Sequence, residues 1–132
     1  MNNKGYTLVE LLAVTVVLGL ILVIAVPSVQ NIMEISERNT FLADAQAIYR
    51  AANTEMLEII DDNGVIFDSS GENKLDLTSA ENYDYCIAFN ESGVITSITV
   101  SNGKYLINGD NHFLDLNEDS VELGNMNSYV CE

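Results

Sequence analysis

The sequence predicts an α+β protein in which one long N-terminal helix packs on a small antiparallel sheet of three to four strands. An uncharged apolar run, residues 11–26, leads into apolar residues spaced at helical intervals. After residue 64, short runs of alternating apolar and polar residues are separated by turn sequences. The chain has 132 residues, which is enough for one modest domain beside the apolar segment.

The first part of the predicted helix is long and apolar enough to span a membrane. Residues 6–33 carry one charge, Glu10, and a few uncharged polar side chains. This segment is longer than the about 20 residues that a helix needs to cross the hydrocarbon of a bilayer. Lys4 on the short side favours a cytoplasmic N-terminus. A charge in hydrocarbon costs roughly 2.5–3.5 kcal/mol at a helix centre, so Glu10 is a functional candidate.

The second part of the predicted helix, residues 34–61, is amphipathic and needs one partner. We expect it to cover the sheet and to end near Asn63-Gly64, because glycine readily adopts the left-handed conformation that ends helices. Its stripe comprises Phe41, Ala45, Ile48, Tyr49, Ala52, Met56, Ile59 and Ile60.

The sheet is predicted within residues 65–131. Asn102-Gly103 indicates a hairpin with a type I′ turn. We expect Val94, Thr96, Ile98 and Val100 to share one face of their strand. Three strands of the sheet are expected at residues 83–89, 94–100 and 104–107, with a fourth short strand near 128–131. A further short strand is expected at 65–67, within the loop that follows the helix.

The run Lys4-Gly5-Tyr6-Thr7-Leu8-Val9-Glu10, followed by the apolar segment, resembles the N-terminus of type IV pilins and their relatives, the type II secretion pseudopilins and competence pilins. The resemblance covers residues 4–27. It implies that prepilin peptidase cuts between Gly5 and Tyr6, so that residues 1–5 are a leader, and that Tyr6 is N-methylated. Phenylalanine is commoner at that position, but the aromatic ring is kept.

The same resemblance implies a structural subunit that polymerises into a type IV pilus for adhesion, motility or surface attachment. Glu10, helped by Thr7, would bind the Tyr6 amine of a neighbouring subunit and set the register. Gly19 and Pro27 would mark a part of the helix that melts in the filament, because proline lacks an N–H and glycine adds backbone freedom.

The resemblance also implies a sequence of compartments and partners. Residues 6–33 would anchor a single-pass cell membrane protein with a cytoplasmic N-terminus, and residues 34–132 would form an extracellular head. Prepilin peptidase, an inner-membrane platform, an assembly ATPase and further copies of the chain are the expected partners. After assembly the protein would be part of an extracellular pilus.

Cys86 and Cys131 lie in the part expected outside the membrane, where an oxidising compartment allows one pairing. Their pairing resembles the C-terminal disulfide loop of many pilins and would contribute ~4 kcal/mol on the chain-entropy model. The alternative is two free thiols or metal ligands, but one histidine and no CxxC argue against zinc.

The acidity of the chain argues against nucleic acid as a partner. Five basic and 20 acidic residues give a net charge of −15, and loss of Lys4 with the leader leaves 4 minus 20, or −16. Phosphate binding depends on Lys and Arg. The acidity instead favours solubility outside the cell.

No catalytic motif, cofactor motif or metal site is predicted, so we do not expect an enzyme. Asp115, Asn117 and Asp119 have the spacing of a calcium loop, but Ser120 and Met126 replace the required Gly and Glu. This excludes an EF-hand and leaves a looser calcium site as the alternative to a solvated loop. His112, in the same loop, is expected at the surface.

Three other interpretations of the chain stay open. Val23-Ile24-Ala25 fits a secretory signal peptide, although Glu10 and Pro27 argue against cleavage there. A plain anchor would make the chain a membrane-tethered binding module that does not polymerise. The chain also fits a pseudopilin of a type II secretion or competence system, which has the same N-terminal motif as a pilin.

Overall fold

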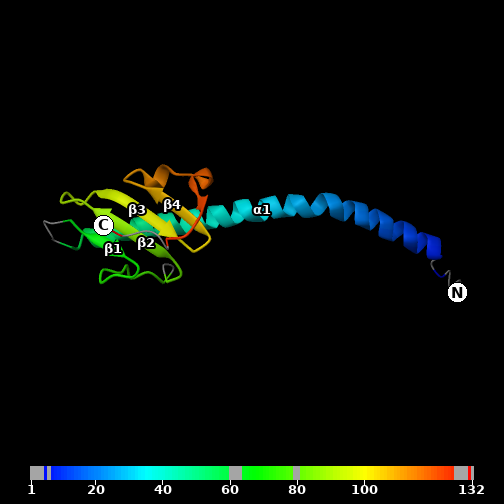
Figure 1. Cartoon of the computed structure of the whole chain (residues 1–132), viewed down its shortest axis with the longest axis horizontal. Helices are drawn as coiled ribbons and strands as arrows, with labels where there is room; N and C mark the ends of the chain where they lie inside the picture. Colours follow the sequence, from blue (N-terminus) through cyan, green and yellow to red (C-terminus); the bar gives the residue numbers. More distant parts are fainter. Residues whose placement is uncertain (1–4, 6, 60–63, 79–80, 127–130, 132) are drawn as a thin grey trace. The chain divides into compact units, whose positions relative to one another are not determined.

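The computed structural model describes residues 5, 7–59, 64–78, 81–126 and 131. It separates into two compact units, Met1–Ser36 and Glu37–Glu132. Helix α1, Leu8–Met56, contributes to both units, and the sheet belongs to the second (Figure 1). The α+β class predicted from the sequence is confirmed.

In the first unit α1 is continuous through Gly19 and Pro27. Every Leu, Ile, Val and Met side chain from Leu8 to Ile35 is at least 50% exposed. A helix that is apolar on all sides and that no described residue covers requires an apolar environment, either lipid or other helices.

The predicted helix end near Asp61 is wrong, because α1 ends at Met56. The amides of Leu57, Glu58 and Ile59 donate to carbonyls three residues back, which tightens the chain into a turn. The last turn holds no basic residue, and the carboxylate of Glu55 opposes the helix dipole there. Asp61 itself lies outside the described residues.

The sheet is an antiparallel meander of five strands in the order β1-β2-β3-β4-β5, rather than three to four. The edge strand β5 is not predicted from the sequence, whereas β1 at the other edge corresponds to the short strand expected at 65–67. Most of the strand predicted near 128–131 lies outside the described residues. The strands are β1 Ile66–Asp68, β2 Asp84–Phe89, β3 Ile95–Ser101, β4 Tyr105–Gly109 and β5 Glu122–Leu123.

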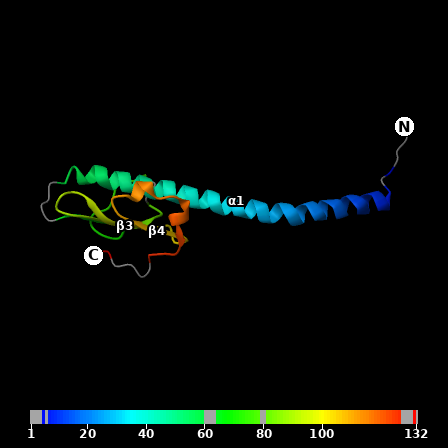
Figure 2. The same cartoon turned by 90° about the horizontal axis from the view of Figure 1, so that it is seen from above.

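The core lies between the sheet and the part of α1 that follows Glu37, which runs along one face of β3 and β4 (Figure 2). Each fully buried large apolar side chain contributes roughly 1.5–3 kcal/mol. The predicted stripe is confirmed as far as Met56, whereas Ile59 is 36% exposed and Ile60 is outside the described residues. The buried helix residues are Phe41, Leu42, Ala45, Ile48, Tyr49, Ala52 and Met56.

The predicted inward face of the third strand is only half right. Ile98 and Val100 are buried, but Val94 is 43% exposed and Thr96 is also exposed. Ile95, which simple alternation places on the opposite face, is 3% exposed and belongs to the core.

A β-bulge explains this change of face. Ala88 pairs with Ser97 and Phe89 pairs with Ile95, so Thr96 is an extra residue without a partner on β2. One inserted residue reverses the inward and outward alternation beyond it. Ile95, the first residue of β3, therefore faces the core.

The turn between β3 and β4 is not of type I′. Asn102 N donates to Tyr105 O, so the two-residue loop is Gly103-Lys104. Only Gly103 has positive φ, +86°, whereas a type I′ turn needs positive φ at both loop residues. Asn102 keeps negative φ while its Oδ1 accepts from the amides of Lys104 and Tyr105.

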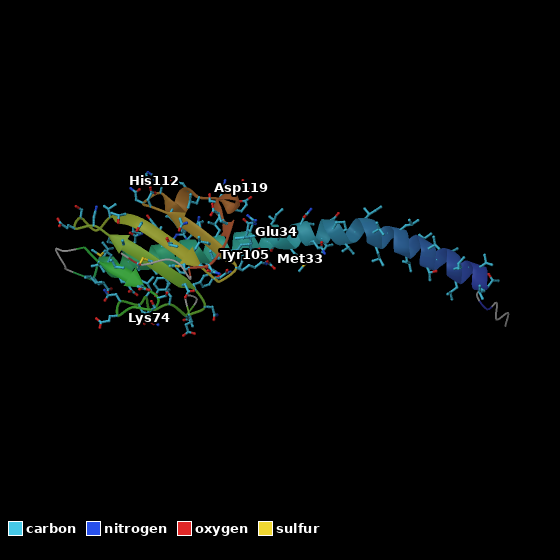
Figure 3. The ribbon with its side chains drawn as sticks, in the orientation of Figure 1. Met33, Glu34, Lys74, Tyr105, His112 and Asp119 are labelled. Atoms are coloured by element: carbon cyan, nitrogen blue, oxygen red, sulfur yellow. A yellow bond between two sulfur atoms is a disulfide. The ribbon has the colours of Figure 1, made fainter. Side chains whose placement is uncertain are left out.

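The segment after β4 contains two short 3₁₀ helices, η2 Phe113–Asp115 and η3 Glu118–Ser120. Phe113 is buried and stacks on Tyr49 with ring centroids 5.6 Å apart. His112 and Asp119 lie on this segment, apart from Lys74 on the loop after β1 (Figure 3). The segment is thus attached to the helix by its aromatic residue and leaves its charged side chains exposed.

Candidate assembly site

Thr7 and Glu10 form a capping box at the start of α1. Thr7 N donates to Glu10 Oε2 at 3.0 Å, and Glu10 N donates to Thr7 Oγ1 at 3.3 Å. The first helical bond, Leu11 N to Thr7 O at 3.1 Å, identifies Thr7 as the N-cap. Such caps contribute about 0.5–2 kcal/mol. The Thr-x-x-Glu spacing is the sequence signal for this arrangement.

The helix that follows the cap can cross a bilayer by its length and composition, and none of its most apolar window is buried. Glu10 lies in its first turn, where the positive end of the helix dipole favours a carboxylate. The arrangement thus combines an apolar helix with one acidic residue in its first turn.

The remaining residues predicted for this region are not gathered into one place. Gly5 is exposed and lies before the helix, and a Cβ atom added to it would meet no atom of the described residues within 4 Å. Tyr6 lies outside the described residues. Gly19 and Pro27 are eight positions apart in the helix, roughly 12 Å at 1.5 Å per residue, and the backbone is helical at both.

A second polar cluster, not predicted from the sequence, lies where α1 enters the second unit. Glu37 Oε2 accepts from Lys104 Nζ and from Tyr105 Oη, the latter at 3.0 Å. The Lys104 ammonium also lies 4.9 Å from the centre of the Tyr105 ring. No short-range signal reveals this cluster, because Glu37 and Tyr105 are 68 residues apart in the chain.

The hydrogen bonds of this cluster shift the pKa values of two of its groups. The hydrogen bond from Lys104, then that from Tyr105, lowers the pKa of the Glu37 carboxyl from its ordinary value. Its bond to Glu37, with a further contribution from Tyr105, raises the pKa of the Lys104 ammonium. Both groups are exposed, so water screens much of their attraction.

The disulfide between Cys86 and Cys131, implied by the resemblance, is present with a Cα–Cα distance of 5.6 Å. Cys86 lies in β2 opposite Thr99, whose hydroxyl donates to Asn108 Oδ1 at 2.8 Å. The bond ties Cys131 to β2, an inner strand of the sheet.

Asn117, one of the residues weighed as calcium ligands, and Asp110 hold the backbone of the segment after β4 through their side chains. Asn117 Oδ1 accepts from Asp119 N at 3.1 Å and caps η3. Asp110 Oδ1 accepts from His112 N at 2.9 Å, and this bond lowers the pKa of the Asp110 carboxyl. Within the described ranges, no three His, Cys, Asp or Glu side chains are grouped as metal ligands.

A polar cavity of about 410 Å³ lies between the loop after β1 and the start of β2. Its wall includes Lys74, Asp76 and Tyr83. The Tyr83 hydroxyl donates to Asp44 on α1 at 2.5 Å, and burial together with this carboxylate raises the pKa of Tyr83. Tyr83 therefore stays a neutral hydrogen-bond donor that fixes the loop against the helix.

The fold and the cap define an α+β protein whose head carries an uncovered apolar helix with a carboxylate at its start. Residues 1–26 match the family model of the prokaryotic N-terminal methylation motif, the signature of type IV pilins and pseudopilins. The N-terminal segment of the chain therefore carries the motif that type IV pilins and pseudopilins share. The motif marks structural subunits rather than enzymes, and it implies a substrate of prepilin peptidase. No curated protein and no solved structure matches the chain.

Proposed function

We propose that the protein is a structural subunit that polymerises through α1 into a type IV pilus filament. The observation that carries this proposal is the exposure of every large aliphatic side chain from Leu8 to Ile35. In a bilayer, lipid covers this surface; in a filament, the same surface of other copies covers it. Burial among many copies supplies the stabilisation, and the head outside the membrane supplies surface attachment or adhesion.

Glu10 sets the register of the subunits. Cleavage between Gly5 and Tyr6 creates a new amine shortly before the helical turn that holds the Glu10 carboxylate. The Tyr6 amine of one subunit, after methylation, binds Glu10 of the next. Desolvation offsets much of the attraction between two buried charges, so this contact specifies alignment more than it adds stability.

Gly19 and Pro27 give α1 its weakest stretch in the filament. The Pro27 ring removes one backbone hydrogen bond and crowds the carbonyl four residues earlier. In a lattice of packed helices, local melting between these two residues lets the subunits adjust to their neighbours.

Electron microscopy of cells and sheared surface material, labelled with an antibody against the head, tests the proposal. Abundant labelled fibres that disappear with Glu10→Ala, while the leader is still cleaved, support a filament subunit. Label confined to the envelope of wild-type cells contradicts it and favours the pseudopilin. A mature protein that keeps its leader favours a tethered binding module.

A further inference from the structure

Arg50 on α1 is a cation without a partner in the part of the chain that the structure describes. Its guanidinium is exposed and, among the described residues, makes no hydrogen bond, ion pair or ring contact. An acidic side chain three or four residues away on the helix could pair with it. Those positions hold Gln46, Ala47, Asn53 and Thr54. In a chain with 20 acidic and five basic residues, such a cation is available to a second molecule.

The side of α1 that carries Arg50 is otherwise uncharged. Its residues recur at steps of three and four, so they share one face of the helix, and they are exposed or half-buried. They are Thr40, Ala43, Ala47, Arg50 and Thr54. This face follows, on the same helix, the apolar residues that we propose to pack in the filament. A second copy is therefore the occupant that it fits, with Arg50 as its one charge.

The polar cavity beside the loop after β1 has the opposite charge. Its wall carries three acidic residues, Asp76, Glu81 and Asp84, and one basic residue, Lys74. Among the described residues, the carboxylates of Asp76 and Asp84 accept no hydrogen bond. Cavities of roughly 300–1,000 Å³ hold drug-sized ligands, so one of about 410 Å³ admits the end of an arginine side chain. A guanidinium can donate to two carboxylate oxygens at once.

Arg50 and the cavity lie on different sides of the second unit. The cavity wall is held to α1 by Tyr83, which donates to Asp44, and by the Asp76 amide, which donates to Glu55 at 3.0 Å. At roughly 100° per residue, Arg50 lies roughly 120–140° around the helix from these two carboxylates. A contact between two different surfaces is heterologous, and its repetition adds copies in a row where the rotation does not close a ring. A filament requires a contact of this kind.

We propose that Arg50 of one copy enters the polar cavity of the next copy, where Asp76 and Asp84 accept its guanidinium. This inference rests on the proposed polymerisation and names a contact between heads, separate from the contact of Glu10. Heads of like charge repel each other, and this pair offsets the repulsion where they meet. Because the pair lies in a cavity, salt screens it less than it screens the repulsion between exposed surfaces.

Filament yield in sheared surface material tests the role of Arg50 in the full-length chain. Arg50→Gln should lower the yield about tenfold, the scale of one charge-assisted hydrogen bond. Ser92→Asp is the control with the same change of net charge, because Ser92 is exposed in the turn between β2 and β3 and aspartate suits turns. It should assemble like wild type.

Thermal unfolding of the same variants in detergent separates a contact between copies from a structural role. Arg50→Gln should keep the Tm of wild type, because the arginine has no partner within the described part of its own chain. A lowered Tm would show that Arg50 acts inside its own head, which overturns the inference.

A charge swap tests whether the cavity is the acceptor. Arg50→Asp and Asp84→Arg should each lower the filament yield about tenfold, because each places like charges at the contact. The double variant keeps the net charge of wild type and restores the opposite pair, so its yield should return to near the wild-type value. Two impaired single variants without recovery in the double variant would exclude the cavity as the acceptor.

The outcomes separate this inference from the function it rests on. If wild type forms fibres and Arg50→Gln assembles as well as Ser92→Asp, the contact between heads is wrong and the filament subunit stands. If wild type forms no fibres, both proposals are wrong.

Discussion

The Tyr105 hydroxyl donates to Glu37 Oε2 at 3.0 Å and so joins the start of β4 to α1 at the first residue of the second unit. Tyr105 is 2% exposed, and its ring lies 5.8 Å from that of Phe41. The polar end of a buried aromatic side chain thus fixes the helix against the sheet, and Lys104 adds the countercharge.

Removing this countercharge should change the stability of the full-length protein in a pH-dependent way. The pKa of Glu37 is lowered from 4.5 in the folded chain, so its contribution is present above that value and is lost as pH falls through the folded pKa. The pKa of Lys104 is raised from 10.5, so its contribution is lost only as pH rises above that value. Lys104→Met should therefore lower Tm between these limits.

Thermal unfolding in detergent, followed by circular dichroism, measures this difference. Lys74→Met is the control, because Lys74 is also exposed and lies on the loop after β1 (Figure 3). A Tm deficit of Lys104→Met that persists unchanged at strongly acidic pH, where Glu37 is protonated, would contradict the role of the ion pair.

Loss of the disulfide should lower the free energy of unfolding by about 4 kcal/mol, the chain-entropy value for a loop of this size. Cys86 and Cys131 are separated by 45 residues. Chemical denaturation of Cys86→Ser, Cys131→Ser and the double variant measures the effect. Because either substitution opens the loop, all three should be about equally unstable; clearly additive losses would show that the thiols act separately.

The bulge in β3 predicts opposite outcomes for two adjacent residues. Ile95→Ala should cost about 2–5 kcal/mol because it leaves a cavity in the core. Val94→Ala should change stability by only about 0.5 kcal/mol, since this side chain is 43% exposed. Denaturant midpoints of the two variants decide between the observed register and the simple alternation, for which the order would be reversed.

Salt should stabilise contacts between heads in the proposed filament. Residues 34–132 hold 19 acidic and 4 basic residues, a net charge of 4 minus 19, or −15. Like charges brought together repel. Salt screens this repulsion beyond a Debye length of about 8–10 Å at roughly 0.1–0.15 M. Sheared filaments should therefore dissociate faster at about 0.01 M NaCl than at about 0.15 M, measured by sedimentation. Faster dissociation at the higher concentration would show that ion pairs between heads dominate.

Much of the candidate site could be predicted from the sequence because its signals are local. The apolar run, Glu10 and Thr7 lie within one short segment, and the family motif covers residues 1–26. The helical stripe from Phe41 to Met56 follows from periodicity alone. The predicted end of α1 near Asp61 is wrong, because the amides that follow Met56 donate to carbonyls three residues earlier instead of four.

The sequence by itself determined the apolar helix, the acid at its start and the α+β class, since each depends on residues that are neighbours in the chain. Only the tertiary structure decided which side of β3 faces the core, how the sheet gains β5, and that Glu37 meets Lys104 and Tyr105. These last contacts join residues that are 67 and 68 positions apart in the chain. A single inserted residue reverses which side chains of a strand face the core. The local sequence of β3 does not reveal the pairing with β2 that places this inserted residue.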